Sequence, residues 1–168
     1  CRIGYGAFMK NTCDLCDEHR DILTVLPFGL RHYGGNVAFH GPVETVKCFE
    51  DNSRIKDLSA TPGEGRVLVV AAAGSLRRAV LGDMIAGALA NNGWAGIVIW
   101  GAVRDVEEMG KLDLGVLALG HVPMPGTRRG GGQIGHDLMI GDAVVQPGAY
   151  LFADVDGVVL FPKDGPRP

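Results

Sequence analysis

The longest apolar segments lie in the middle of the chain. Residues 67–73 and 97–100 are unbroken apolar runs, each of a length that suits a strand buried on both faces. Residues 91–93, Asn-Asn-Gly, tolerate a left-handed backbone and are typical of a helix end. Between the runs, apolar residues recur at steps of three and four, which predicts a helix carrying Leu81, Met84, Ile85, Ala88 and Leu89. This pattern predicts a strand, a helix and a parallel strand joined by a right-handed crossover.

The residues before this central unit predict two helices and two strands. The first helix has Thr12 or Asp14 as its cap and ends before Pro27, which cannot continue a helix. We expect this helix over residues 12–26, strands over 33–41 and 42–50, and a second helix from Asp51 or Asn52 through Leu58.

The residues after the central unit are mostly β in character. A short acidic segment follows Asp105, residues 124–135 form a glycine-rich loop, and Asp156-Gly157 is a signal for a two-residue hairpin. We expect strands over residues 112–119, 136–140, 143–145, 150–153 and 158–161. Strands at both ends and helices in the middle predict an α/β fold of layered sheets with helices on one face.

Composition favours a single globular domain. A chain of 168 residues is long enough to bury roughly two thirds of its unfolded surface. The net charge of −3 and the 7% aromatic content argue against direct binding of nucleic acid, which needs concentrated positive charge and stacking rings. No apolar run approaches the roughly 20 residues that span a bilayer, so we expect a soluble, cytoplasmic protein without membrane contact. Residues 1–11 lack the pattern of a signal peptide, and we expect a mobile extension there, one domain over residues 12–163 and a tail over residues 164–168.

Known metal and nucleotide motifs are incomplete in this chain. Cys13 and Cys16 form a CxxC, which suits a redox pair or half of a zinc site, but no second CxxC and no paired histidines follow. We therefore expect reduced thiols. Residues 154–157 begin like a calcium loop without its later ligands, and neither GxGxxG nor GxxxxGK[ST] is present.

Two residue pairs in the central unit carry the polar groups best suited to chemistry. Gly82-Asp83 stands where a helical segment is expected to begin, so its backbone N–H groups are candidates for holding an anion. Arg104-Asp105 follows the second strand, and in open parallel sheets ligands bind beyond the carboxyl ends of strands. A guanidinium beside a carboxylate offers one group for a substrate carboxylate and one for a hard divalent cation. By local chemistry alone, an ordinary surface ion pair is the better interpretation of Arg104-Asp105, and a functional role is the alternative.

Two further arginine pairs allow more than one interpretation. Arg77-Arg78 suits a surface or a contact between subunits better than catalysis. Arg128-Arg129, in the glycine-rich loop, suits either plain solvation or the binding of an anionic ligand or partner.

Four segments together resemble one protein family. They are YGGNVAFHGPVETVKCFEDN, VLVVAAAGSLRRAVLGDMIA, NNGWAGIVIWGAVRDVEE and LFADVDGVVL, and in this order they resemble the family named for the regulator of ribonuclease E activity A, the RraA-like family. The family includes the class II 4-hydroxy-4-methyl-2-oxoglutarate aldolases, many of which also decarboxylate oxaloacetate. The resemblance implies a single three-layer β/β/α swivelling domain, similar to a phosphohistidine domain and assembled as a homotrimer or hexamer.

The resemblance also implies roles for particular residues. Arg104 would grip a small 2-oxo acid, and Asp105 would hold a divalent metal, Mg²⁺ or Mn²⁺. Glu108 matches the acidic residue that follows in the motif. The substrate would also be held by the backbone amides of Gly82, Asp83, Met84 and Ile85. A cation on Asp105 would withdraw charge from the keto acid as an enolate of pyruvate forms.

The chain departs from many relatives near these residues. Residues 71–74 read AAAG where many relatives read DGGG, and Asn36 stands where many have arginine. The resemblance therefore leaves two functions open. One is a lyase that releases pyruvate from a 4-hydroxy-2-oxo acid or from oxaloacetate. The other is a regulator that binds an endoribonuclease of the ribonuclease E type and modulates RNA turnover.

Overall fold

The computed structural model describes residues 10–167. The fold is built on one curled sheet of ten strands. Its ten strands are β1 (Thr24–Val25), β2 (Arg31–His32), β3 (Phe39–Lys47), β4 (Val67–Ala71), β5 (Ala79–Leu81), β6 (Gly96–Val103), β7 (Gly115–His121), β8 (Gln133–Ile134), β11 (Tyr150–Asp154) and β12 (Gly157–Phe161). A separate ribbon pairs β9 (Leu138–Ile140) with β10 (Ala143–Val145). The helices are α1 (Thr12–His19), α2 (Ser53–Ser59), α3 (Asp83–Asn91) and α4 (Val106–Met109).

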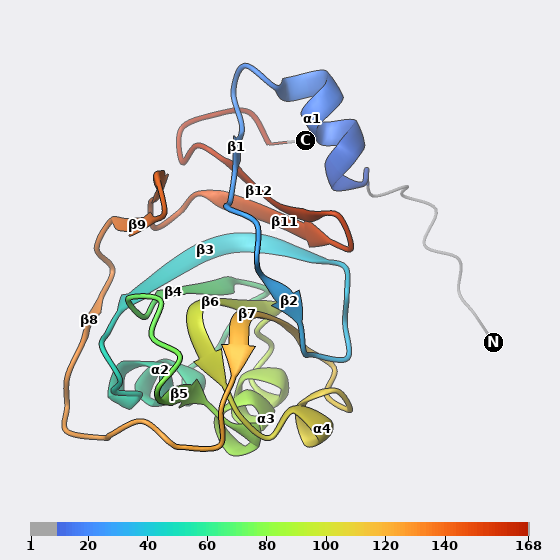
Figure 1. The fold of residues 1–168 in the computed structure, drawn as a ribbon. Coiled ribbons are helices and arrows are strands. Elements are labelled where there is room, and N and C mark those ends of the chain that lie inside the picture. The colour runs from blue at the N-terminus through green and yellow to red at the C-terminus, as the bar shows by residue number, and fades with distance from the viewer. Residues whose placement is uncertain (1–9, 168) are drawn as a thin grey trace.

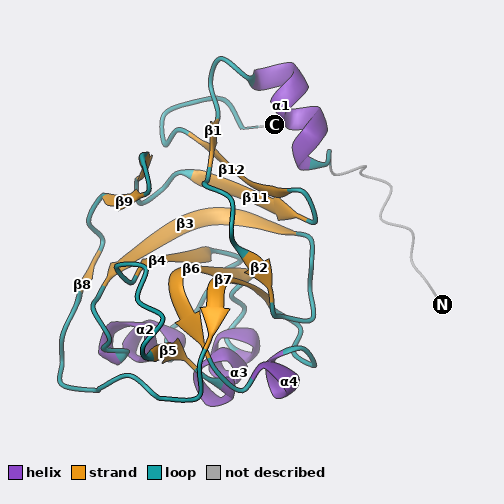
Figure 2. Cartoon of the chain, viewed as in Figure 1, coloured by secondary structure: helices purple, strands orange, loops and turns teal. Residues whose placement is uncertain are grey.

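The sheet has a parallel centre and antiparallel margins. Strands β3, β4, β6 and β7 run parallel in this order, as expected for strands joined by helical crossovers. Strands β11, β12 and β1 extend the sheet from β3 in antiparallel fashion. Figure 1 shows how the sheet folds over itself at β3, with β11 and β12 above and α2, α3 and α4 below. Figure 2 shows the same layers by secondary structure, with α1 outermost.

Separate apolar clusters hold these layers together. In β4, Leu68 and Val70 pack toward the helices, whereas Val67 and Val69 pack into the space enclosed by the curl. Leu15 of α1 joins a third cluster on the outer face of β11 and β12. The prediction of a strand buried on both faces is confirmed. The predicted α/β class, with three layers in one domain, is confirmed as well.

The central unit follows the prediction except at Leu81 and Met84. Both predicted strands are present as β4 and β6, and they are parallel neighbours. The expected helix, however, does not include Leu81, because residues 79–81 form β5 and pair with β6. Met84 is also wrong as a core residue, since it is 85% exposed. A local 3.6-residue pattern cannot anticipate a pairing that depends on the position of a distant strand.

The predicted helix over residues 12–26 is wrong beyond His19. Residues 24 and 25 pair with β12 at the edge of the sheet, and the N–H of Leu26 donates to the carbonyl of Val158. The cap is Asn11 rather than Thr12 or Asp14, because the Asn11 side chain accepts a hydrogen bond from the N–H of Asp14 at 2.8 Å. Residues 1–9 of the predicted N-terminal extension lie outside the described part of the chain.

The prediction of two strands over residues 33–41 and 42–50 is also wrong. A single strand, β3, runs through Gly41 and Pro42, and residues 33–38 form a loop. Pro42 fits inside the strand because the pairing with β4 begins only at Val43.

Smaller corrections concern the second half of the chain. The acidic segment after Asp105 forms α4, whose Met109 is fully buried. Strand β7 begins at Gly115 rather than at residue 112, β9 begins at Leu138, and the glycine-rich loop contains the short strand β8. The predicted hairpin is present, but Asp154 pairs with Gly157, so its two loop residues are Val155 and Asp156. Within residues 10–167 no helix has the length and apolar character needed to cross a membrane.

The ring of Phe39 fills a notch between two strands. Gly96 of β6 and Gly115 of β7 are register partners, and a Cβ atom at either position would overlap this ring. Phe39 itself is 5% exposed. Because Gly96 and Gly115 have no side chains, the Phe39 ring packs directly against β6 and β7 and connects β3 to the centre of the sheet. This contact contributes to the close packing typical of protein interiors.

We expect Gly115→Ala to lower the free energy of unfolding by about 1–3 kcal/mol, because the added methyl group forces the Phe39 ring out of its position. Urea denaturation monitored by circular dichroism measures this change. Combining Gly115→Ala with Phe39→Leu should cost less than the sum of the two single substitutions. Additive costs would show that the ring and the notch are not coupled.

Candidate functional site

The ends of two parallel strands bring the predicted site residues together. Leu81, the last residue of β5, is the register partner of Val103, the last residue of β6. The N–H of Arg104 then donates to the carbonyl of Leu81 at 2.9 Å, which ties the two strand ends to each other. The start of α3 and the Arg104-Asp105 pair consequently lie side by side, on the side of the sheet that the strand polarity predicts.

Asp105 is held in an unusual backbone conformation. Its φ of 56° and ψ of 42° lie in the left-handed region, which aspartate tolerates better than most residues. Asp105 precedes α4, but its side chain makes no capping bond to α4. Its Oδ2 instead accepts a hydrogen bond from the N–H of Asp83 at 3.2 Å, at the start of α3. The left-handed turn thus directs the carboxylate toward a neighbouring helix rather than its own.

The charge of Asp105 is stabilised by its surroundings. The hydrogen bond from the Asp83 N–H, together with the Arg104 guanidinium, holds the pKa of Asp105 below its usual range, although partial burial acts in the opposite direction. The Nε of Arg104 lies 3.4 Å from Oδ2. Both of these contacts end on Oδ2, and the side chain of Asp83 also interacts with the carboxylate. Asp105 is therefore an ionised carboxylate held mainly through Oδ2, and Oδ1 keeps acceptor capacity for a ligand.

Arg104 is fixed less tightly than its neighbour. Its Nη1 donates to the carbonyl of Pro123 at a long 3.4 Å, and its side chain is 36% exposed. A guanidinium with weak internal partners retains donors for a ligand, and its fork suits a carboxylate.

The first turn of α3 supplies further donors. Gly82 is the N-cap and has no side chain, while the N–H of Ala86 makes the first intrahelical bond, to the carbonyl of Gly82. The N–H groups of Met84 and Ile85 lie in the turn that has no intrahelical acceptor. A ligand anion placed there gains both these donors and the positive end of the helix dipole.

A pocket of about 250 Å³ collects these groups. Arg104, Asp105 and all four residues of the predicted Gly82–Ile85 turn line it, so the structure brings them together. Its remaining lining residues are Asn52, Ala79, Pro125 and Arg128. The sequence did not predict that Asn52, Ala79 and Pro125 line the pocket, because they come from three separate segments and their residue types mark no function. Arg128 was visible only as a basic residue in a glycine-rich loop.

Glu108, the secondary candidate, is not part of this pocket. It lies on α4, and its carboxylate accepts a hydrogen bond from Lys111 at 2.9 Å. No cluster of three or more His, Cys, Asp or Glu side chains suited to a metal ion occurs within residues 10–167. Among residues 10–167, Cys13, Cys16 and Cys48 are free cysteines.

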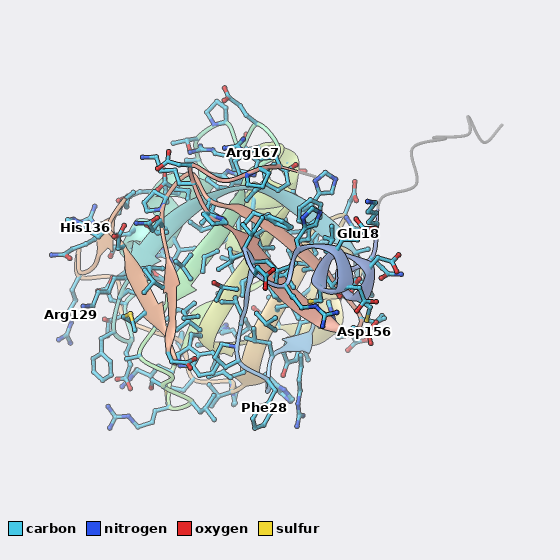
Figure 3. The ribbon with its side chains drawn as sticks, turned by 90° about the horizontal axis from the view of Figure 1, so that it is seen from above. Glu18, Phe28, Arg129, His136, Asp156 and Arg167 are labelled. Carbon is cyan, nitrogen blue, oxygen red and sulfur yellow. The ribbon has the colours of Figure 1, made fainter. Side chains whose placement is uncertain are left out.

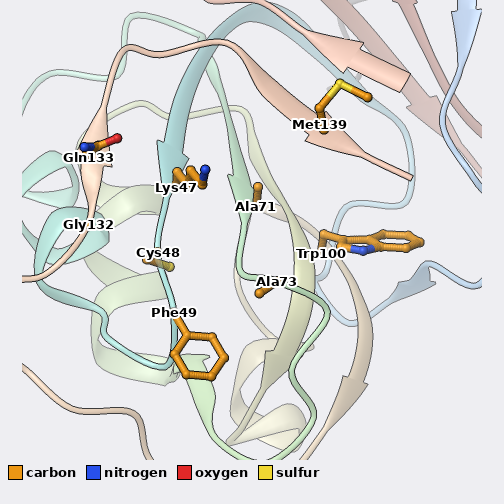
Figure 4. A pocket seen from close by; sticks show the side chains of 9 residues that line it. All are labelled: Lys47, Cys48, Phe49, Ala71, Ala73, Trp100, Gly132, Gln133 and Met139. Atoms are coloured by element: carbon orange, nitrogen blue, oxygen red, sulfur yellow. The ribbon is translucent and has the colours of Figure 1, made fainter. Parts of the chain in front are cut away.

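A second pocket is larger but poor in groups for chemistry. Its volume is about 600 Å³, and it lies at the ends of β3 and β4 beside β6. Figure 4 shows Phe49, Trp100 and Met139 around its mouth, with Lys47 and Gln133 as its polar side chains. Ala71 and Ala73, from the segment that reads AAAG where many relatives read DGGG, are among its walls.

Asp51 anchors the loop that carries Arg128. This carboxylate is 5% exposed and accepts hydrogen bonds from the N–H of Ser53 at 2.9 Å, the N–H of Arg129 at 2.7 Å and the hydroxyl of Thr127 at 3.2 Å. Burial alone would raise the pKa of Asp51, but these hydrogen bonds outweigh burial and hold the pKa well below its usual range.

Comparison with known proteins identifies the class of protein. The family model described as RraA-like, Aldolase/RraA, matches residues 12–160. The chain belongs to the RraA-like family, as the four sequence segments predict.

Relatives of this chain carry enzyme names. A protein of Alcanivorax borkumensis is 49% identical over 154 residues, which cover 90% of this chain and 96% of that protein. A protein of Ectopseudomonas mendocina is 47% identical over 152 residues, which cover 90% and 94%. The provisional name of both is 4-hydroxy-4-methyl-2-oxoglutarate aldolase.

Solved structures share the fold. The RNA-processing inhibitor RraA from Thermus thermophilis superposes with a TM-score of 0.90 at 37% identity, over 96% of each chain. A Geobacillus kaustophilus protein, named S-adenosylmethionine: 2-dimethylmenaquinone methyltransferase, superposes with a TM-score of 0.89 at 42% identity, over 93% of this chain and 96% of that one. The three-layer fold is thus shared by proteins with quite different names.

The Asp51 network leads to a prediction about acid stability. Because the folded-state pKa of Asp51 is depressed, its contribution to stability is complete above the unfolded-state pKa of about 4 and is lost as the pH falls below it. Asp51→Asn should lower the free energy of unfolding at pH 7 by about 1–3 kcal/mol, since an amide nitrogen would face the Arg129 N–H. The variant should also lose less stability than the wild type between pH 5 and pH 3.

Urea denaturation at several pH values measures both effects. Asp57→Asn is the matched control, because Asp57 lies in α2, shortly after Asp51, in an exposed ion pair with Arg54. Equal pH slopes in wild type and Asp51→Asn would contradict the prediction.

Proposed function

We propose that this protein is a carbon–carbon lyase that releases pyruvate from a 4-hydroxy-2-oxo acid, such as 4-hydroxy-4-methyl-2-oxoglutarate, or from oxaloacetate. The observation that carries the proposal is the placement of Asp105. It presents an ionised carboxylate, held mainly through Oδ2, in a pocket that also holds a weakly engaged guanidinium and the donors at the start of α3. The provisional names of the relatives support the same reaction.

The residues of the pocket match the charges of a 2-oxo acid. Arg104 offers a planar fork to the carboxylate next to the keto group, and the N–H groups of Met84 and Ile85 offer neutral donors. In carbon–carbon cleavage, negative charge moves onto the keto oxygen as an enolate forms. Arg104 stabilises this charge because a guanidinium is never deprotonated and is already oriented by the pocket.

The donor set fits a hard divalent cation, Mg²⁺ or Mn²⁺. Asp105 would hold it through Oδ1, and one protein carboxylate is enough for an ion that keeps most of its waters. When bound, such an ion supplies Lewis acidity toward the keto and carboxylate oxygens of the substrate.

Oxaloacetate is the sharper test substrate. Its decarboxylation needs no base in the step that breaks the bond, because carbon dioxide leaves as the enolate forms. Aldol cleavage, in contrast, requires a group that removes the proton of the 4-hydroxyl. Decarboxylation therefore tests the role of Arg104 and Asp105 without depending on a base that the pocket residues do not identify.

We further propose a homotrimer or hexamer in the cytoplasm. Phe49, Leu76 and Met139 are 61%, 53% and 59% exposed, and apolar side chains of this size are commonly covered by a partner subunit. Phe49 and Met139 flank the larger pocket in Figure 4. The free thiols of the described residues support a reducing compartment.

A second candidate function is the binding and inhibition of a ribonuclease E-like endoribonuclease. The close superposition with an RNA-processing inhibitor supports it. Such a regulator would act through its outer surface and would not need the Asp105 carboxylate. One molecule can carry both functions, so the two are tested separately.

We expect Asp105→Asn to reduce pyruvate formation from oxaloacetate by about 100-fold or more in the presence of Mg²⁺, since the lost charge can neither bind a cation nor pair with Arg104. Asparagine tolerates the left-handed backbone, so the thermal midpoint should stay close to that of the wild type. A coupled lactate dehydrogenase assay measures the rate. Equal rates in both proteins would exclude the lyase proposal, while equal inhibition of a purified endoribonuclease by both would favour the regulator.

We expect Gly82→Ala to reduce the same rate by about tenfold or more while the fold is retained. The backbone of Gly82 is extended, with φ −123°, which alanine adopts freely. Its new Cβ, however, would lie 2.8 Å from Oδ2 of Asp105 and displace the carboxylate. Gly87→Ala is the matched control, because a Cβ there has no neighbour within 4 Å. This control should keep full activity and gain about 0.5–1 kcal/mol of stability as a helix substitution; similar rates in the two variants would exclude the proposed position of the carboxylate.

A further inference from the structure

The pocket is lined by a second arginine, Arg128, which comes from a different segment of the chain than Arg104. Arg104 follows β6, whereas Arg128 comes from the loop between β7 and β8, and both line the same cavity. The proposed chemistry at the keto group uses Arg104 and leaves Arg128 without a role.

The backbone around Arg128 is unusually well fixed for an exposed loop. On its amino-terminal side, the N–H groups of Gly126 and Thr127 donate to the carbonyls of Ala79 and Glu50, both at 2.7 Å. On its carboxyl-terminal side, the N–H of Arg129 donates to buried Asp51 at 2.7 Å. Arg128 is therefore presented from a segment that is tied to β5 and to the start of α2.

The Arg128 side chain also has a defined direction but no compensating charge. Its Nε donates to Oδ1 of Asn52 at 3.1 Å, and Asn52 itself lines the pocket. Arg54, Arg77 and Arg78 each pair with a carboxylate. Across residues 10–167, by contrast, no carboxylate lies within 4.0 Å of the Arg128 guanidinium. An arginine that is oriented by a neutral amide and lacks an anionic partner is suited to receive an anion from outside.

We propose that Arg128 is a specificity-determining residue that binds the second carboxylate of a dicarboxylic 2-oxo acid, while Arg104 binds the carboxylate beside the keto group. This inference rests on the proposed lyase function, since it assigns the far end of the same substrate. Two arginines from different segments that line one pocket favour a ligand with two carboxylates over one with a single carboxylate. A 2-oxo acid that ends in a methyl group, such as pyruvate, leaves Arg128 in contact with water, so Arg128 does not increase its affinity.

The neighbouring residue offers a matched control. Arg129 has the same charge and lies in the same loop, but it does not line the pocket. Figure 3 shows Arg129 at the edge of the molecule. Its contact with Asp51 is made by the backbone N–H, which Arg129→Gln leaves in place. Arg129→Gln therefore removes one positive charge from the loop without changing the pocket.

We expect Arg128→Gln to raise the KM for oxaloacetate by about 10- to 100-fold, the range typical of a lost charge-assisted hydrogen bond. The kcat should stay the same or rise, because the carboxylate that Arg128 binds is the one that loses its charge and leaves as carbon dioxide. Inhibition by pyruvate, which lacks the second carboxylate, should change less than about twofold. Arg128→Lys should recover part of the KM because it restores the charge without the fork. Arg129→Gln should behave like the wild type. An equal loss of affinity for oxaloacetate and pyruvate, or no change for either, would overturn the role of Arg128.

Calorimetry separates a failure of this inference from a failure of the lyase proposal. With Mg²⁺ present, the wild type should bind 2-oxoglutarate, a stable dicarboxylic 2-oxo acid, more tightly than pyruvate, and Arg128→Gln should abolish that preference. If the wild type releases no pyruvate but shows this preference, the lyase proposal fails and the role of Arg128 stands. If it binds both acids equally, or binds neither, the role of Arg128 is wrong whatever the activity.

Discussion

The parallel pairing of β5 with β6 is the constraint on which the site depends. Strand β5 is three residues long, and its pairing with β6 includes a register irregularity, yet it brings Leu81 opposite Val103. Because β5 and β6 both end at this pair, the segments that follow the two strands start next to each other at the same edge of the sheet. The segment after β5 begins α3 with Gly82 as its N-cap, and the segment after β6 begins α4 with Asp105 as its N-cap. The N–H groups of α3, the Arg104 guanidinium and the Asp105 carboxylate lie close together only because the two strands end side by side.

Bringing these groups together requires an unfavourable backbone conformation at Asp105. A non-glycine residue in this region costs about 1–2 kcal/mol, so the surroundings must impose it. Here the preceding N–H is tied to β5, and the Asp105 carbonyl accepts the first bond of α4, from the N–H of Met109 at 2.9 Å. Fixed on both sides, the residue turns its carboxylate toward Asp83 and away from its own helix. A relaxed backbone would place the same charge in solvent, where it would neither cap α3 nor face a ligand.

The sequence allowed the central strands, the start of α3 and the Arg104-Asp105 position to be predicted, because each has a local cause. Apolar runs mark β4 and β6, and the turn residues mark the helix end. The edge strand at residues 24–25, the single strand through Gly41 and Pro42, and β5 were not predictable in this way. Each is stabilised by a partner far along the chain, and short segments carry too little periodicity to reveal it. Asn52 and Pro125 join the pocket for the same reason, by tertiary placement alone.

Asp51 and Asp105 have different roles at the pocket, and the difference follows from their surroundings. Asp51 is 5% exposed and surrounded by donors from Ser53, Thr127 and Arg129, so its oxygens are fully used in holding the loop. Asp105 has a 33% exposed side chain, and its hydrogen bonds with the Asp83 N–H and with Arg104 both end on Oδ2. Both have depressed pKa values and are ionised at neutral pH, so charge alone does not distinguish them. What distinguishes them is the number of unused acceptor positions, which makes one a structural anchor and leaves the other free for chemistry.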